Sequence, residues 1–524
     1  MFRKIACVIG ALGVLAWGGA ARAQAPKPLT MICEATFPPY EYHVRDGIDG
    51  IDPALVRIVA KCLGRPVDVQ DMAFDAVIPA ISTGKADIAA SGITVTEERR
   101  KQVLFSVPYV EAAQVVVVRQ GSPLQKPAEL AGRRLAVQSG STGDLFVTKT
   151  FGEPERFQNV SFAITAVLSG KAEAAVVDAA PAAVFLENTA GLRILDEPAV
   201  AEAYAFAFEK SRRLLCAQVN AILQTMRRQG TLERLCARYV EATRAFKEDK
   251  NALGERLDLT DLEAEVLADE ALQAQLRALS TEDQALEGDE VGPRRSLWRA
   301  WRETLHLNFV AGDRWRYLVR GFGVTVEISF FAVLIGLALG FVVAVIRATH
   351  TLQGGLPVAN ALCKLYLTVI RGTPAVVQLL IIYFVIFGSV NVSKVLVAVV
   401  AFGFNSGAYV SEIIRAGILS IDKGQMEAGR SLGLGYLRTM RVIILPQAFR
   451  NVLPALGNEF IVLLKETSVA GYIALMDLTK AGDVIRSQTY TAFLPLLAVA
   501  AIYLAVVSLL TCLLGALERR LKNG

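Results

Sequence analysis

Two stretches of sequence decide how the first half of the chain is organised, VIPAISTGKAD at residues 77–87 and AITAVLSGKAE at residues 163–173. In each, a helical apolar pattern runs up to a glycine, Gly84 or Gly170, that can take the left-handed conformation with which many helices end. A strand-like run follows each glycine. Because the same helix-to-strand turn occurs twice, we predict two similar lobes. The alternative is a chance likeness of two such turns.

The residues around these turns, 29–243, alternate strand-like and helical patterns. Short apolar runs at residues 29–33, 88–93 and 114–119 are typical of strands, and residues 53–63 carry a helical pattern. Such alternation favours an α/β domain. We therefore expect residues 26–243 to form one domain with two α/β lobes.

Residues 1–25 have the three parts of a secretory signal peptide. Arg3 and Lys4 precede an apolar run at residues 5–17, and Ala21-Arg22-Ala23 forms a small-x-small cleavage site. We expect the α/β domain to lie outside the cytoplasm, on the periplasmic or extracellular side. The alternative is an uncleaved anchor helix, although the apolar core is short for a span of about 20 residues.

The composition excludes a purely soluble or disordered protein. Of the 524 residues, 53% are hydrophobic and 20% charged, and the mean hydropathy is +0.41. Five apolar stretches predict five membrane helices, at residues 318–346, 365–390, 394–421, 456–476 and 491–516. We expect an all-α membrane domain at residues 316–524. The excess of Lys and Arg in alternate connections places the C-terminus inside.

Residues 244–315 differ from both neighbours. Between residues 247 and 290 there are 14 acidic side chains against four basic ones, which favours a solvated, charged linker. The alternative is a helix that buries one Leu and Ala stripe. Next, Trp298, Trp301 and Trp315 alternate with arginines, a pattern typical of an interfacial helix on the membrane lipid. A buried packing helix is the alternative there.

Five short motifs in the α/β part resemble the periplasmic substrate-binding proteins for polar amino acids, of the family 3 type. They are FPPYEY at residues 37–42, GITVTEER at 92–99, VLFSVPY at 103–109, QSGST at 138–142 and VD at 177–178. The resemblance implies two lobes joined by hinge strands, near residues 112–115 and 204–208, with the ligand enclosed between the lobes.

The resemblance also implies a set of substrate-binding residues: Glu34, Phe37, Phe74, Gly92, Thr94, Arg99, Thr142 and Asp178. An α-carboxylate suits the bidentate, always charged Arg99, and an α-ammonium suits the carboxylate of Asp178. Counting Glu34, the pocket charge is about minus one, which favours neutral polar or cationic amino acids over glutamate. The alternatives are a surface ion pair for Arg99 and core positions for the two phenylalanines.

The membrane part carries EAGRSLGLG at residues 427–435 and IILPQA at 443–448 between the third and fourth predicted spans. Together with RGTP at 371–374 and KETS at 465–468 they resemble the EAA loop and flanks of polar amino acid ABC importer permeases. The resemblance implies that Glu427, Ala428, Gly433 and Pro446 couple the spans to a cytoplasmic ABC ATPase dimer. The alternative is an ordinary amphipathic loop.

The sequence contains no GxxxxGK[ST] motif. We therefore expect no enzyme activity and no bound cofactor or metal, with ATP and Mg held by the partner ATPase. Scattered basic residues and a net charge of +5 argue against nucleic acid. Five spans are too few for a pathway in this family, which implies a homodimer or pairing with a similar permease.

The predicted function is that of a fused binding protein and permease of an ATP-driven importer for polar amino acids in the inner (plasma) membrane. A ligand-gated channel or receptor, and a periplasmic enzyme on the same scaffold, are the alternatives. Four cysteines of the exported part, Cys33, Cys62, Cys216 and Cys236, form bridges or stay free thiols, and their pairing is open.

Overall fold

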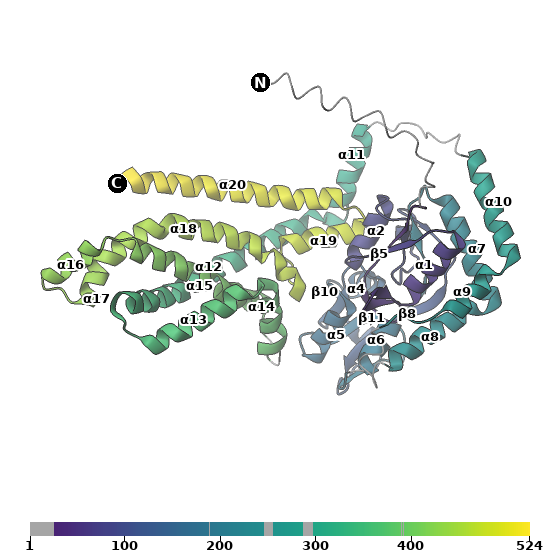
Figure 1. The fold of residues 1–524 in the computed structure, drawn as a ribbon, viewed down its shortest axis with the longest axis horizontal. Coiled ribbons are helices and arrows are strands. Elements are labelled where there is room, and N and C mark those ends of the chain that lie inside the picture. Colours follow the sequence, from purple (N-terminus) through teal and green to yellow (C-terminus); the bar gives the residue numbers. More distant parts are fainter. Residues whose placement is uncertain are drawn as a thin grey trace, which may run out of the picture.

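The computed structural model describes residues 26–187, 189–245, 255–286, 297–388 and 390–523 except 391. The predicted signal peptide lies outside these residues. Figure 1 shows an α/β part at one end of the molecule and long helices extending away from it.

The first lobe is built on a sheet of order β5-β1-β6-β14-β7. Its strands are β1 (Leu29–Cys33), β5 (Val67–Asp71), β6 (Ile88–Ala89), β7 (Leu104–Phe105) and β14 (Ala207–Phe208). Helices α1 (Ile51–Cys62), α2 (Phe74–Ser82), α3 (Glu97–Arg100), α7 (Arg213–Gln229) and α8 (Thr231–Ala245) belong to this lobe, as does a small sheet of β2 (Thr36–Phe37), β3 (Glu41–Val44) and β4 (Gly47–Asp49).

The second lobe has a sheet of order β10-β9-β11-β8-β12, with β13 also paired to β8. Its strands are β8 (Val110–Arg119), β9 (Leu135–Gln138), β10 (Glu155–Phe157), β11 (Ala174–Asp178), β12 (Leu192–Ile194) and β13 (Val200–Tyr204). Helices α4 (Thr142–Thr150), α5 (Val160–Leu168) and α6 (Ala179–Glu187) pack on it.

The predicted two-lobe α/β fold is confirmed, and the repeated turn marks one equivalent position in each lobe. Helix α2 ends before Gly84, which has φ +71°, and β6 follows; α5 ends before Gly170, with φ +73°, and β11 follows. The chain crosses between the two sheets twice, from β7 to β8 and from β13 back to β14. Both crossings adjoin the predicted hinges.

The acidic segment is not a solvated tether over residues 255–286, so that prediction is wrong there. Helices α9 (Thr260–Leu267) and α10 (Glu270–Leu286) bury Leu262, Val266 and Leu272 completely against the first lobe. Apolar residues four positions apart share one helix face, as in the alternative with a buried stripe. Burying each such side chain contributes about 1.5–3 kcal/mol to the packing of these helices on the lobe.

The membrane part is all helical in the described residues, as predicted. It contains α12 (Trp315–Gln353), α13 (Pro357–Gly372), α14 (Ala375–Ile381), α15 (Lys394–Leu419), α18 (Leu445–Glu466), α19 (Leu478–Thr489) and α20 (Phe493–Asn523). Three of these, over residues 315–352, 394–419 and 493–520, are long and apolar enough to cross a membrane.

Two of the five predicted spans are broken in the structure. The second is divided between α13 and the stretch from Ala375 to Ile386, bent by 108° at Pro374 and counted as a fourth candidate span. Pro374 has no N–H to continue the helical hydrogen bonding. The fourth ends at Glu466 and continues as a 3-10 turn, Thr467–Ile473, before Ala474 adopts a left-handed conformation.

The predicted coupling segment forms two short helices, α16 (Lys423–Ser431) and α17 (Tyr436–Thr439). They lie at the end of the helical part farthest from the α/β lobes (Figure 1). The tryptophan-rich segment covers α11 (Leu297–Leu305) and the start of α12. Trp301 of α11 and Trp315 of α12 are each about half exposed. Its place at a membrane surface stays a prediction.

Candidate functional site

Arg99 joins the two lobes. Thr96 caps α3 by accepting a hydrogen bond from the Arg99 amide at 3.2 Å. The guanidinium is buried, donates to the Thr94 carbonyl at 2.8 Å, and donates to the Gly140 carbonyl of the second lobe at 3.1 Å. It also lies 5.6 Å from the ring centroid of Phe74. The alternative of an exposed surface ion pair is wrong for this residue.

The two predicted threonines meet through residues that the sequence did not single out. Gln114, on β8, donates to Thr142 at 3.2 Å and to Glu202 at 3.2 Å. Thr94 of the first lobe donates to the same Glu202 carboxylate at 2.7 Å. One hydrogen-bonded cluster therefore contains groups from both lobes.

The predicted acidic residues lie at the same interface between the two lobes, which is called the cleft from here on. Asp178, at the end of β11, is buried and accepts a hydrogen bond from the Tyr204 hydroxyl. Glu34 is also buried, accepts from the Thr36 hydroxyl, and accepts from Gln138 of the second lobe at 3.4 Å.

Aromatic rings line one side of this cleft. Phe37 lies 5.7 Å from Tyr40, and Tyr40 packs edge-on against Tyr204 at 5.1 Å, both measured between ring centroids. Gly92 has φ +50°, and a Cβ atom there would lie 2.7 Å from Cε1 of Phe37. Only glycine fits this approach, since a side chain would be strained and would displace the ring.

Burial changes the protonation of both cleft carboxyls. It raises the pKa of Glu34 to about 7. It also raises the pKa of Asp178 to about 7, with Glu202 adding to the shift. A nearby cation favours the ionised form of such a carboxyl, so a ligand with a positive charge gains more here than a neutral one.

Two further carboxyls lie behind the cleft. Glu41 accepts from Ser91 at 2.8 Å, and Asp52 accepts from the Gly92 amide at 3.0 Å and from Tyr109 at 2.6 Å. Both are fully buried, and burial raises the pKa of Asp52 to about 7 and that of Glu41 well above its usual value. Both carboxyls are therefore less ionised near neutral pH than exposed carboxyls would be.

Several buried polar atoms around the cleft have no hydrogen-bond partner among the described residues. They are Arg99 Nε, Gln114 Oε1, Ser139 Oγ, Glu41 Oε2 and Glu202 Oε1. An unsatisfied buried group costs about 1–3 kcal/mol, so such groups are rare and their concentration in one place is informative. They are suited to a small ligand that carries both donors and acceptors.

The contacts above bring the eight predicted substrate residues together along the interface between the lobes, and their role in binding stays a prediction. Sequence reasoning missed four of their neighbours, Gln114, Gln138, Glu202 and Tyr204. Gln138 belongs to a quoted motif, and the other three lie in or beside the predicted hinge segments. Hinge residues face both lobes, which is the signal that would have found them.

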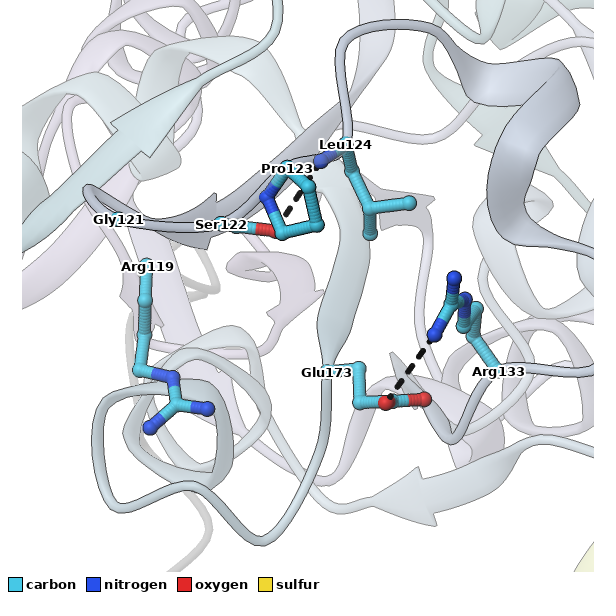
Figure 2. Close-up of a pocket in the computed structure, with 7 residues that line it drawn as sticks. All are labelled: Arg119, Gly121, Ser122, Pro123, Leu124, Arg133 and Glu173. Atoms are coloured by element: carbon cyan, nitrogen blue, oxygen red, sulfur yellow. Dashed lines mark hydrogen bonds and ion pairs between the residues drawn. The ribbon is translucent and has the colours of Figure 1, made fainter.

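The mouth of the cleft faces the helical part. A cavity of about 690 Å³ is lined there by Thr94, Gly140 and Glu202 from the lobes, and by Tyr317 and Gln488 from the helices. A separate pocket of about 460 Å³ lies in the second lobe and is lined by Arg119, Gly121, Ser122, Pro123, Leu124, Arg133 and Glu173 (Figure 2). It contains none of the predicted site residues, and its Arg133 and Glu173 pair with each other at 3.6 Å.

The coupling segment is strongly exposed. Gly433 has φ +83° and makes the turn between α16 and α17. The adjoining Leu432 and Leu437 are each 81% exposed, which is typical of a contact site for another protein. Glu427 lines a pocket of about 400 Å³ between this segment and α15, and Pro446 lies in the first turn of α18.

The four cysteines of the α/β part, Cys33, Cys62, Cys216 and Cys236, are free thiols in the structure.

Two family models match the chain. Bacterial extracellular solute-binding proteins, family 3, match residues 29–242. The inner membrane component of binding-protein-dependent transport systems matches residues 336–523.

Individual relatives match each part separately. The arginine transport system permease protein of Bacillus subtilis is 39% identical over 210 residues, which is 40% of this chain and 94% of that protein. The glutamine transport system permease protein of Escherichia coli is 40% identical over 208 residues, covering 39% of this chain and 93% of that protein. The arginine-bound form of ArgBP from T. maritima is 37% identical, with 38% of this chain and 95% of that chain covered and a TM-score of 0.37.

Proposed function

The chain belongs to two transporter families, the family 3 extracellular solute-binding proteins and the inner membrane components of binding-protein-dependent transport systems. From this membership we propose how the chain handles its substrate. It is the fused binding protein and permease of an amino acid ABC transporter. Both matched families are transporter components rather than enzymes.

The proposed substrate is a cationic or neutral polar amino acid, with arginine the first candidate. The observation that carries the proposal is the buried Arg99 at a lobe interface that also contains the carboxyls of Glu34, Asp178 and Glu202. Arg99 suits the α-carboxylate, Asp178 the α-ammonium, and Glu34 a positive or amide side-chain end. Acidic amino acids are disfavoured, because a second ligand carboxylate would face Glu34. The names of the relatives, arginine and glutamine permeases, agree with this class.

Closure of the lobes retains the amino acid. Arg99 contacts both lobes and Gln138 reaches Glu34 across the cleft, so the bound ligand stabilises a closed arrangement. Release occurs through the cavity at the mouth, toward the helices.

The membrane topology and the remaining subunits are also proposals. The exposed α16–α17 segment at the far end of the helices suits a cytoplasmic ATPase dimer that holds ATP and Mg. The lobes then lie on the periplasmic or extracellular side of the inner membrane. Two permease domains, from a homodimer or a similar partner, enclose the pathway.

Equilibrium binding to the full chain in lipid nanodiscs tests the substrate class, with labelled L-arginine, L-lysine, L-glutamine and L-glutamate. We expect arginine, lysine or glutamine to bind and glutamate to bind at least tenfold more weakly. Arg99→Lys removes the planar, bidentate hydrogen-bond donor to the α-carboxylate. Binding should weaken by about 2–4 kcal/mol, roughly 30- to 900-fold. The matched control is Arg45→Lys, a well-exposed arginine outside the cleft.

Failure of all four amino acids to bind, or wild-type affinity in Arg99→Lys, would overturn the proposal. Amino-acid-gated ion current without ATP-driven accumulation would instead indicate the channel alternative.

A further inference from the structure

The lobes contact the helical part at several polar points, among them a hydrogen bond that Lys171 donates to the Phe387 carbonyl at 3.0 Å. Asp75 on α2 of the first lobe pairs with Arg486 on α19 at 2.8 Å. In the second lobe, Glu155 pairs with Lys394 at 2.8 Å, and Glu153 accepts a hydrogen bond from the Tyr317 hydroxyl at 2.6 Å. Tyr317 lies in the first turn of α12, the first long apolar helix.

A continuous series of hydrogen bonds leads inward from Tyr317. Glu153 also accepts from Arg156 at 2.6 Å. Arg156 is buried and donates through Nε to both oxygens of Asp144, at 2.8 and 3.0 Å. Asp144 in turn accepts from the Gly140 amide at 3.0 Å.

Gly140 is the residue whose carbonyl accepts from Arg99. The turn at Gly140 is therefore fixed on one side by Asp144 and meets the first lobe on the other. The helical part also touches this turn directly, because a Cβ atom at Gly140 would lie 3.0 Å from Cβ of Ser487 on α19 and 3.3 Å from Cβ of Asp75. First lobe, second lobe and permease meet at this single glycine.

We propose that Tyr317 is a positioning residue for lobe closure, acting through Glu153, Arg156 and Asp144 on the Gly140 turn that meets Arg99. The first long helix of the permease and the closed state of the cleft thereby stabilise each other. On the other side of the same turn, the Arg486–Asp75 pair holds the first lobe. The permease therefore contacts both lobes where they meet, and these contacts differ between the closed and the open arrangement of the lobes.

The geometry favours coupling over a merely local contact. Arg156 and Asp144 are buried, and Arg156 also donates to Thr148 at 2.8 Å, so the middle of the series has little freedom to move independently. Removing the Tyr317 hydroxyl takes one hydrogen-bond partner from Glu153. The support of the Gly140 turn is then weaker. Coupling of this kind is reciprocal, so a change at the cleft also affects the start of α12.

Hydrogen–deuterium exchange of the full chain in nanodiscs tests the proposal without any amino acid. Tyr317→Phe removes only the hydroxyl, and we expect amides at residues 139–145 to exchange roughly three- to tenfold faster than in wild type. Arg316→Gln is the control, since the neighbouring Arg316 is exposed and forms an ion pair with Asp313 at 3.1 Å. From the other end, Glu153→Gln is expected to speed exchange at residues 315–321.

A purely local role for Tyr317 would change exchange at residues 315–321 alone and would overturn the proposal. A uniform rise over the whole chain would overturn it as well, because it indicates general loss of stability. The double variant Tyr317→Phe/Glu153→Gln should add little beyond either single change at residues 139–145, whereas additive effects contradict a shared series.

The inference rests on the proposed function only in treating the Arg99 cleft as the ligand site. Binding of L-arginine is therefore measured on the same samples. Failure to bind arginine overturns the proposed substrate and leaves the exchange result to decide the coupling.

Discussion

Amino acid binding is expected to weaken as the pH falls below 7. In the ligand-free chain, burial raises the pKa values of both Glu34 and Asp178 to about 7. A cationic amino acid binds to their ionised forms, which a positive ligand then keeps ionised. Each proton present on the free site must leave when the ligand binds, so protons compete with the ligand and the affinity is higher at high pH.

The size of the effect follows from these two pKa values. Each carboxyl multiplies the dissociation constant by the factor 1 + 10^(pKa − pH). For a pKa of about 7, this factor is about 1.1 at pH 8 and about 11 at pH 6. One carboxyl therefore weakens binding about tenfold over this range, and two weaken it about 100-fold. The estimate treats the two groups as independent, and any interaction between them spreads the change over a wider range.

Equilibrium binding of labelled L-arginine to the full chain, at half-unit steps between pH 6 and 8, measures this slope. Glu34→Gln keeps the size of the side chain but removes one titrating group, so the change should fall to about tenfold. The control is Glu255→Gln, since Glu255 is highly exposed and pairs with Arg45 outside the cleft. A pH-independent affinity, or tighter binding at pH 6, would refute the reasoning.

Three further substitutions address the turn, the lobe contacts and the coupling segment. Gly140→Ala places a side chain at φ +76° and against Ser487, so arginine binding should weaken by about five- to 30-fold, measured by the same binding assay. Lys394→Gln leaves Glu155 without its partner and should lower the melting temperature of the full chain, while the double variant with Glu155→Gln recovers part of the loss. Leu432→Asp, at an exposed position of the coupling segment, should abolish ATP-driven uptake in cells yet leave arginine binding unchanged.

Local sequence signals determined several features of this protein. The glycines at residues 84 and 170 permit the left-handed backbone with which a helix ends, and both adopt it, so the repeat was visible in the sequence. The long apolar stretches predict membrane helices, because lipid offers the backbone no hydrogen-bond partners and a helix satisfies its own backbone groups. The short motifs around Arg99 predict a candidate ligand site between the lobes, and each motif contributes its residues within a few positions of a turn or a cap.

Only the tertiary structure decided features that depend on distant residues. Glu202 and Gln114 join the candidate site because β13 pairs with β8, and no local pattern expresses that pairing. The acidic segment at residues 255–286 is polar by composition, yet its few apolar residues pack against the first lobe and are buried there. Contacts such as Tyr317 with Glu153 join residues 164 positions apart. Short-range sequence patterns fix how a segment folds, whereas its neighbours are fixed by how whole elements pack.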